Sequence, residues 1–168
     1  MTDKQDPAQV MHELLVRQRV SELRARYCWY VSRGDYEGLV QLYTPDGLFE
    51  FSVLGPRETH RGHAQLREGL ARSVYPGEIF PMVRNEVTVV DGDTAVGTCT
   101  MEARTTYPDM PRFSGYYHDR FRVHDGVWRF AERRFFRYMP VFERSGLDIV
   151  GAPETGLSAQ HDRKRSAT

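Results

Sequence analysis

Apolar residues recur at steps of four and three along residues 10–31, near the start of the chain. The stripe consists of Val16, Val20, Leu23, Tyr27 and Tyr30. Because an α-helix has about 3.6 residues per turn, this spacing places these side chains on one face of an amphipathic helix. We therefore expect Tyr27 and Tyr30 to point toward the core.

The polar stretch SRGD, residues 32–35, interrupts the helical pattern. Gly34 can adopt the left-handed conformation that ends a helix, and Asp35 can cap the start of a second one. The apolar residues of this short second helix are Leu39, Val40 and Leu42. The stretch is thus predicted to be a joint between two helices.

Patterns typical of strands dominate the rest of the chain. TPDG, residues 44–47, has turn chemistry, and LFEFSVL after it has the length and aromatic content of a strand. A loop at residues 55–62 leads to a third helix at residues 63–73. Longer strands are predicted at residues 79–90, 94–106, 113–124 and 127–139, with hairpin turns at Asp91-Gly92-Asp93 and Asp125-Gly126.

Helices followed by a long antiparallel sheet indicate an α+β fold. Strands of this length twist and curl, so the sheet is expected to wrap around the long helix and enclose a cone-shaped hydrophobic pocket. We predict a flexible N-terminus at residues 1–9, one domain at residues 10–142, and a C-terminal extension at residues 143–168. The extension is small, polar and unpatterned, so we expect it to be largely mobile.

Composition narrows the function classes. A chain of 168 residues with 40% hydrophobic residues can bury one sizeable core. The chain has 23 Lys and Arg residues and 23 Asp and Glu residues, so its formal net charge is zero. Nonspecific electrostatic binding to nucleic acid or to an anionic membrane is therefore not expected. The sequence begins without a signal-peptide pattern and has no apolar run that could span a bilayer, which favours a cytoplasmic protein.

Cys28 and Cys99 lie far apart within apolar patterns. They read as buried free thiols rather than as a disulfide or a metal site. His60 and His63 flank a loop but have no third ligand at a convincing spacing, so we expect no metal. Motifs for nucleotide binding and serine hydrolysis do not occur in the sequence.

Alternation along two predicted strands selects their inward faces. On residues 94–106 the inward set is Ala95, Gly97, Cys99, Met101 and Ala103, which directs Glu102 outward, toward an arginine. On the next strand the inward set is Tyr117, Asp119, Phe121 and Val123. A buried carboxylate must find donors or hold a proton, so Asp119 is either a catalytic group or half of a structural ion pair with an arginine of the following strand.

The last long strand, VWRFAERRFFRYM, mixes aromatic and charged residues on both faces, so periodicity cannot assign its inward side. Arg133 and Arg137 are candidates for holding an anionic or enolate oxygen, and the alternative is that they are solvated or paired with acids. Tyr27 and Tyr30 could stabilise a developing oxyanion, or they could simply be packed.

The chain resembles the SnoaL-like group of the nuclear transport factor 2 superfamily over about residues 10–140. The resemblance rests on the order and spacing of Y..YVSRGDYEGLVQLYTPDGLFEF, RGHAQLREGL, VTVVDGDTAVGT and YYHDRFRVHDGVWRFAERR. It implies an α+β cone with a deep pocket, a homodimer or higher homo-oligomer, and chemistry without a cofactor. The group includes polyketide cyclases, ketosteroid isomerase, scytalone and bile acid dehydratases and a dehydrochlorinase, as well as noncatalytic binders.

Residue by residue, the resemblance is partial. The aspartate and histidine of the dehydratase-like members fall at Ser32 and Pro81, and the base of ketosteroid isomerase falls at Phe51, beside Glu50. Tyr27 matches the oxyanion tyrosine of the isomerase. Asp119 matches the hydrogen-bonding aspartic acid of the isomerase. Arg133 resembles the pocket arginine of the dehydrochlorinase, and Arg137 resembles the arginine of the bile acid enzyme.

Two hypotheses follow. In the first, the chain is a lyase, isomerase or cyclase for a hydrophobic, cyclic or polyketide-like molecule, with Tyr27, Asp119 and Arg133 as catalytic residues. The substrate-binding residues would be Tyr30, Phe49, Phe51, Met82, Met101, Tyr117 and Arg137. In the second, the protein is a noncatalytic binder or accessory protein that uses the same pocket.

Overall fold

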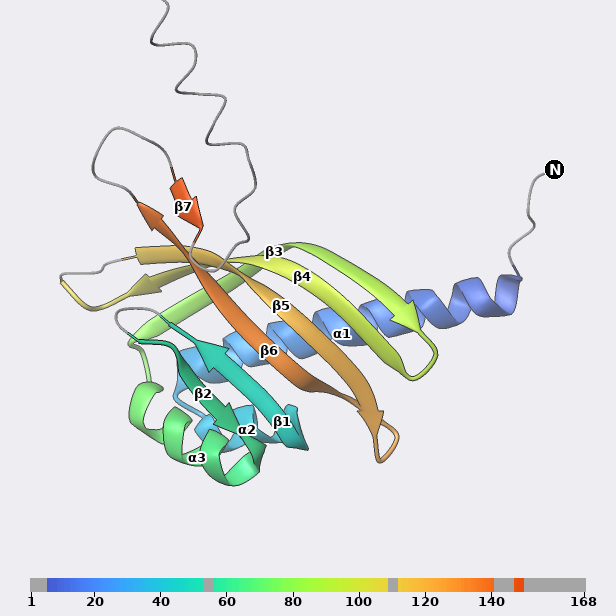
Figure 1. Cartoon of the computed structure of the whole chain (residues 1–168), viewed down its shortest axis with the longest axis horizontal. Helices are drawn as coiled ribbons and strands as arrows, with labels where there is room; N and C mark the ends of the chain where they lie inside the picture. Colours follow the sequence, from blue (N-terminus) through green and yellow to red (C-terminus); the bar gives the residue numbers. More distant parts are fainter. Residues whose placement is uncertain (1–5, 53–55, 109–111, 141–146, 150–168) are drawn as a thin grey trace, which may run out of the picture.

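The structure is a computed structural model that describes residues 6–52, 56–108, 112–140 and 147–149. The helices are α1 (Pro7–Arg33), α2 (Tyr36–Gln41) and α3 (Gly62–Ser73). The strands are β1 (Tyr43–Phe51), β2 (Glu58–Arg61), β3 (Ile79–Asp91), β4 (Thr94–Thr105), β5 (Arg112–His124), β6 (Val127–Pro140) and β7 (Leu147–Ile149). The α1 helix runs along one face of a curved sheet, and α2 and α3 lie at the end near β1 and β2 (Figure 1).

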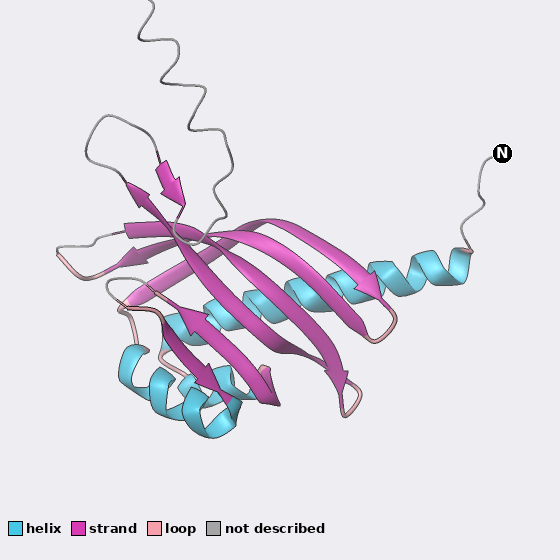
Figure 2. Cartoon of the chain, viewed as in Figure 1, coloured by secondary structure: helices cyan, strands magenta, loops and turns pink. Residues whose placement is uncertain are grey.

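The sheet is open and mixed. Its strand order is β2-β1-β6-β5-β4-β3, with β7 paired to β6. The α+β prediction is confirmed, but the all-antiparallel prediction is wrong at one place, because β1 and β6 run parallel. A parallel pair needs a long crossover connection, and the elements between β1 and β6 supply it (Figure 2).

The predicted joint between the first two helices is confirmed. Gly34 has φ 70°, and the amides of Gly34 and Asp35 donate to the last carbonyls of α1. A Cβ on Gly34 would lie 2.4 Å from the ring of Pro76, so both conformation and space require glycine here. The Asp35 side chain caps α2 by accepting from the Gly38 amide at 2.8 Å.

Two local predictions are wrong. The TPDG segment lies inside β1, and the pairing register with β6 shifts between Tyr43 and Leu48, so turn-forming residues occupy an irregular stretch of strand. The predicted loop at residues 55–62 contains β2, which pairs with β1. Only His60 of β2 is buried, so this edge strand lacks the alternation that would predict it.

The predicted C-terminal extension contains one described element, the short strand β7. The remainder of residues 143–168 lies outside the described residues. No helix in the described ranges is long and apolar enough to cross a membrane.

The inward faces predicted for β4 and β5 are confirmed, because Ala95, Cys99, Met101, Tyr117 and Asp119 are all buried. On β6 the inward side changes along the strand. Its buried residues are Trp128 and Phe130, followed by Arg133 and Phe135. The register with β5 shifts at this point, and the extra residue reverses the alternation, which is why both faces read as mixed in the sequence.

Candidate functional site

A cavity of about 280 Å³ lies between the C-terminal half of α1, the end of α3 and the concave sheet. Its wall is mostly apolar. The wall includes Tyr27, Phe49, Phe51, Met101, Phe113 and Tyr117. Because apolar walls with few polar groups are typical of small-molecule sites, this cavity is the candidate functional site.

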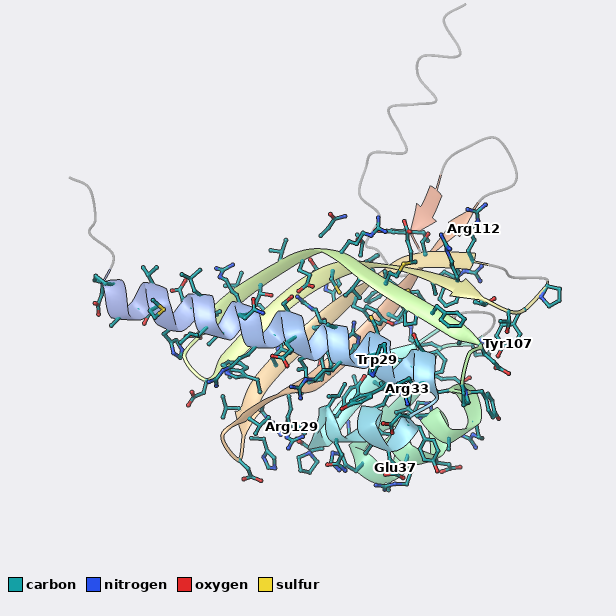
Figure 3. All side chains as sticks on the ribbon, turned by 180° about the vertical axis from the view of Figure 1, so that it is seen from behind. Trp29, Arg33, Glu37, Tyr107, Arg112 and Arg129 are labelled. Atoms are coloured by element: carbon teal, nitrogen blue, oxygen red, sulfur yellow. The ribbon has the colours of Figure 1, made fainter. Side chains whose placement is uncertain are left out.

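Burial distinguishes the floor of the cavity from its rim. The side chains of Tyr27, Tyr117 and Met101 are buried, whereas Phe51 and Phe113 are half-buried. Tyr107 at the rim is 39% exposed. Figure 3 shows Tyr107 at one end of the sheet, with Arg112 nearby and Arg129 far from both. Tyr107 is thus the exposed part of the wall, and the two buried tyrosines are its interior part.

Two tyrosines from different elements meet at the floor. The ring centres of Tyr27 on α1 and Tyr117 on β5 lie 5.9 Å apart at an interplanar angle of 73°. Burial raises the pKa of Tyr27 and raises that of Tyr117 well above its ordinary value, and the nearby Arg133 cation partly opposes both shifts. The interaction between the two side chains lowers the pKa of Tyr27 and raises that of Tyr117, so it opposes the first shift and adds to the second. At neutral pH the pair is therefore un-ionised and can donate a hydrogen bond.

Arg133 lies behind this pair rather than in the cavity wall. Its guanidinium carbon is 3.6 Å from the ring centre of Tyr117 and 4.2 Å from that of Tyr27. The side chain is completely buried, and its Nε and Nη1 atoms have no hydrogen-bond partner among the described residues. Its Nη2 lies 4.0 Å from the Cys99 sulfur. The ring of Phe130, at 4.6 Å, is a third aromatic neighbour, so three rings and a weak thiol contact lie around a buried cation.

Asp119 connects Arg133 to a second buried arginine. Arg24 donates from Nε to Asp119 Oδ2 at 3.0 Å, and Arg133 Nε lies 3.7 Å from Asp119 Oδ1. Arg24 also donates to Glu86 at 3.1 Å and to the Thr88 hydroxyl at 3.3 Å. Burial alone would lower the pKa of Arg133, but the Asp119 carboxylate and the neighbouring phenols raise it, so the guanidinium stays charged.

Sequence reasoning missed Arg24. It lies four residues after Val20 and three before Tyr27, which places it on the buried stripe of α1. A charged residue at such a position must find a buried partner, and Asp119 was already expected to be inside the sheet. The two observations together could have predicted this ion pair.

The predicted site residues divide into three groups. Those in the cavity wall are Tyr27, Phe49, Phe51, Met101 and Tyr117. Asp119 and Arg133 lie beneath the floor, paired with each other and, for Asp119, with Arg24. Outside both places are Tyr30, Met82 and Arg137.

The geometry explains these three exceptions. Tyr30 is turned to the side of the α1 stripe and lines a groove with Trp128 and Arg129. Met82 pairs with Glu102, whose side of β4 faces away from the core. Arg137 lies two residues beyond the buried Phe135 and shares a neighbouring polar hollow with Met82.

The described part of the wall contains no carboxylate and no imidazole. Ser32 donates from its hydroxyl to the Cys28 carbonyl at 3.0 Å, and Pro81 contributes only apolar surface to the wall. His60 stacks on Phe51, with ring centres 6.0 Å apart, behind the cavity wall. Within the described ranges, no group of three or more metal-binding side chains comes together.

The sequence matches the SnoaL-like domain family over residues 12–134. The chain belongs to the SnoaL-like family. No functionally curated protein matches the sequence significantly.

Solved structures support the fold of this SnoaL-like chain. Rv3472 of Mycobacterium tuberculosis, a protein of unknown function, is 27% identical, with a TM-score of 0.66 over 94% of this chain and 91% of that one. A putative scytalone dehydratase from Novosphingobium aromaticivorans is 19% identical, with a TM-score of 0.66 over 84% of this chain and 97% of its own. LinA is 16% identical, with a TM-score of 0.66 over 77% of this chain and 90% of its own. At these two lower identities the likeness is one of fold alone.

Proposed function

We propose that this SnoaL-like protein is a cofactor-independent lyase, isomerase or cyclase that acts on a hydrophobic, cyclic or polyketide-like small molecule. The observation that carries the proposal is the buried Tyr27–Tyr117 pair, whose rings meet edge to face in the wall of a mostly apolar cavity. The aromatic wall holds the rings, and the hydroxyl pair is the polar anchor for one ligand oxygen.

The chemistry that suits this anchor is proton removal beside a carbonyl. When the C–H bond next to the carbonyl breaks, its electron pair moves onto the carbonyl oxygen, which becomes an enolate. A tyrosine donor in a water-poor site stabilises that charge more than it stabilises the neutral ketone. The cavity of about 280 Å³ is near the lower end of the range of roughly 300–1,000 Å³ for ligand sites, which favours a small ring system.

The described wall supplies no group that could accept the proton. If the protein is an enzyme, the proton is accepted by water or by a basic group of the substrate itself. The same observation favours a second candidate function, a noncatalytic binder or accessory protein that uses the tyrosine pair only to recognise an oxygen.

Hydrogen exchange distinguishes the two candidates. The probe is 2-tetralone, an enolisable ketone with two fused rings, incubated with the protein in deuterated water and followed by mass spectrometry. An enzyme accelerates deuterium incorporation beside the carbonyl, and Tyr27→Phe or Tyr117→Phe lowers that acceleration by about tenfold or more. Binding without acceleration supports the noncatalytic binder. If the protein neither binds 2-tetralone nor accelerates the exchange, the proposal is overturned.

We further propose a cytoplasmic homodimer or higher homo-oligomer. Exposed Val87, Val89 and Val96 on neighbouring strands β3 and β4 support a self-association surface, and the free thiols of Cys28 and Cys99 support a reducing compartment. Native mass spectrometry of the purified protein measures the oligomeric state and any molecule retained in the cavity. A monomer at micromolar concentration would contradict the oligomer.

A further inference from the structure

A second concavity lies beside the candidate functional site, where the last residues of β4 meet the first residues of β5. This hollow of about 360 Å³ is lined by residues of β3, β4, β5 and β6, and it shares only Ala103 and Phe113 with the cavity wall. Its described lining contains one carboxylate, Glu102. It also contains four arginines, and we call it the arginine hollow after Arg84, Arg104, Arg112 and Arg137.

Three of these arginines have no partner among the described residues. Arg84 on β3, Arg104 on β4 and Arg112 on β5 are exposed, and their side chains form no hydrogen bond or ion pair within those ranges. Arg112 lies at the end of the sheet near Tyr107 (Figure 3). The register places Arg104 directly opposite Arg112. Because like charges in directly opposed positions destabilise a sheet, this pair opposes folding unless an anion lies beside the two guanidinium groups.

The one carboxylate in the described lining leaves these charges unmatched. Glu102 is exposed on the outer side of β4, as the alternation predicts, but the expected ion pair with an arginine does not form within the described structure. Its cross-strand neighbours are Met82 and Ser114 rather than an arginine. The hollow therefore has a local excess of positive charge, although the formal net charge of the chain is zero.

Arginines farther along the same face are matched with acids. Arg120 and Arg112 both point to the outer face, because the register of β5 with β4 is unbroken between them. Arg120 lies 3.8 Å from Glu132. Arg134 on β6 pairs with Glu132 at 3.2 Å and with Glu50 at 3.3 Å. The unmatched charge is thus a property of the hollow and not of the whole face.

Neutral groups in the hollow suit the same kind of ligand. Ser114 and Tyr138 are half-buried and carry hydroxyl groups that can donate hydrogen bonds. The Tyr138 ring packs against Tyr116, with ring centres 5.6 Å apart, which holds it beside the hollow. Guanidinium and hydroxyl donors together match a group with several negatively charged oxygens, and arginine binds the oxygens of phosphate in pairs.

We propose that the arginine hollow binds the phosphate group of a phosphate ester or of pyrophosphate, and that Arg84, Arg104 and Arg112 hold it. A carboxylate has two oxygens and a single charge. A phosphate monoester has three terminal oxygens and a charge of about −1.5 to −2 at neutral pH, so it matches three guanidinium groups better. The inference assigns a second site and does not rest on the function proposed for the cavity.

Isothermal titration calorimetry of the full-length protein with inorganic pyrophosphate tests this site. We expect the wild-type protein to bind with a dissociation constant of about 1 mM or lower at an ionic strength of about 0.15 M. Arg104→Gln and Arg112→Gln should each weaken binding by about tenfold or more, because each removes charge-assisted hydrogen bonds.

Arg120→Gln is the matched control. It removes the same charge from the same face of the same strand, at roughly 26 Å from Arg112 along β5. This separation is well beyond the Debye length of about 8 Å, so the affinity for pyrophosphate should change by less than about twofold. An equal loss in Arg120→Gln and Arg112→Gln would reduce the binding to nonspecific attraction and overturn the inference.

Two further measurements separate a phosphate site from a structural cluster. Glu102→Gln removes the one carboxylate of the described lining, so pyrophosphate binding should become severalfold tighter. Without pyrophosphate, Arg104→Gln should leave the midpoint of thermal unfolding unchanged or raise it, because the opposed like charges are relieved. A lower midpoint together with unchanged pyrophosphate binding would show that the arginine serves stability and would overturn the inference.

A second titration identifies the source of the phosphate. Phenyl phosphate presents the group on a soluble molecule, and phosphatidylcholine vesicles that contain phosphatidate present it as a lipid headgroup. Binding of either one that depends on Arg104 and Arg112 supports the site and assigns its ligand class. Failure of pyrophosphate, phenyl phosphate and the vesicles to bind would overturn the inference. A change of oligomeric state in Arg104→Gln without phosphate binding would also overturn it, because the hollow would then be a contact between copies of the chain.

Discussion

The guanidinium carbon of Arg133 lies 3.6 Å from the centre of the Tyr117 ring, with both side chains buried. Tyr117 faces the cavity, and Arg133 lies behind it, linked to Asp119 and thence to Arg24. The neutral Tyr117 hydroxyl is thus the group that would contact a ligand. The positive charge of Arg133 lies behind the Tyr117 ring. The residue that lines the cavity is therefore distinct from the buried ion pairs behind it.

Removing the Tyr117 hydroxyl should weaken ligand binding without unfolding the protein. In Tyr117→Phe the ring packing against Tyr27 and Arg133 is retained, but the hydroxyl that could donate to a ligand is lost. We expect a loss of about 0.5–1.5 kcal/mol in the binding free energy of 2-tetralone. Isothermal titration calorimetry measures this loss.

Tyr43→Phe is the matched control for this hydroxyl deletion. Tyr43 is fully buried, lies outside the cavity wall, and its hydroxyl has no hydrogen-bond partner among the described residues. Removing this hydroxyl should leave binding unchanged. The free energy of unfolding should stay the same or rise by up to about 1 kcal/mol. A loss of affinity equal to that of Tyr117→Phe would contradict a specific role for the floor pair.

Filling the cavity should block binding at little cost in stability. Ala103 is 1% exposed and lines the cavity, so the added methyl groups of Ala103→Leu can occupy empty space. Ala95→Leu, at a buried position on the same strand face outside the cavity wall, should instead destabilise the protein by about 1–3 kcal/mol through overpacking. Thermal unfolding and probe titration are compared for both variants, and full retention of binding in Ala103→Leu would exclude this cavity as the ligand site.

The buried arginine on α1 should be important for stability. Arg24→Met leaves Asp119 with only the longer contact to Arg133, and breaking a buried ion pair in this way costs about 3–5 kcal/mol. Arg67→Met breaks an exposed pair and should cost less than about 1 kcal/mol. Urea denaturation gives both values, and equal small losses would show that the Arg24–Asp119 pair contributes little to stability.

Alkaline pH should destabilise the fold through its buried phenols and thiols. Burial raises the pKa of Cys99 from 9.0 to about 11, and it raises those of Tyr43 and Tyr117 well above the ordinary 10.0. The unfolded chain therefore releases these protons at a lower pH than the folded chain, so this stability is complete below about pH 9 and is lost as the pH rises. Urea denaturation at a series of pH values should show this decline. Ionisation of Tyr43 and Tyr117 near pH 10 with an unchanged circular dichroism spectrum would contradict it.

Much of this fold follows from local patterns in the sequence. The α1 stripe, the Gly34–Asp35 joint and the β4 alternation each depend on neighbouring residues, and each was predictable. Tyr27 and Met101 were placed in the cavity by the same periodicities. Their environments are set mainly by the element to which they belong.

Features that depend on distant partners were not predictable in the same way. The parallel pairing of β1 with β6 and the register shift near Ala131 arise from how the sheet is assembled, so the inward side of Arg133 could not be assigned. The role of Arg24 depends on Asp119, which is 95 positions away in the chain. Sequence reasoning identified the buried acid but not the partner that holds it beneath the floor.

The most direct test is a crystal structure of the protein with 2-tetralone. We predict that the carbonyl oxygen lies at a hydrogen-bonding distance of about 2.5–3.0 Å from the Tyr27 or Tyr117 hydroxyl, with the rings between Phe49 and Met101. A molecule bound in reverse, with its carbonyl oxygen beside the exposed Tyr107 and its rings against the two tyrosines, would contradict the central claim.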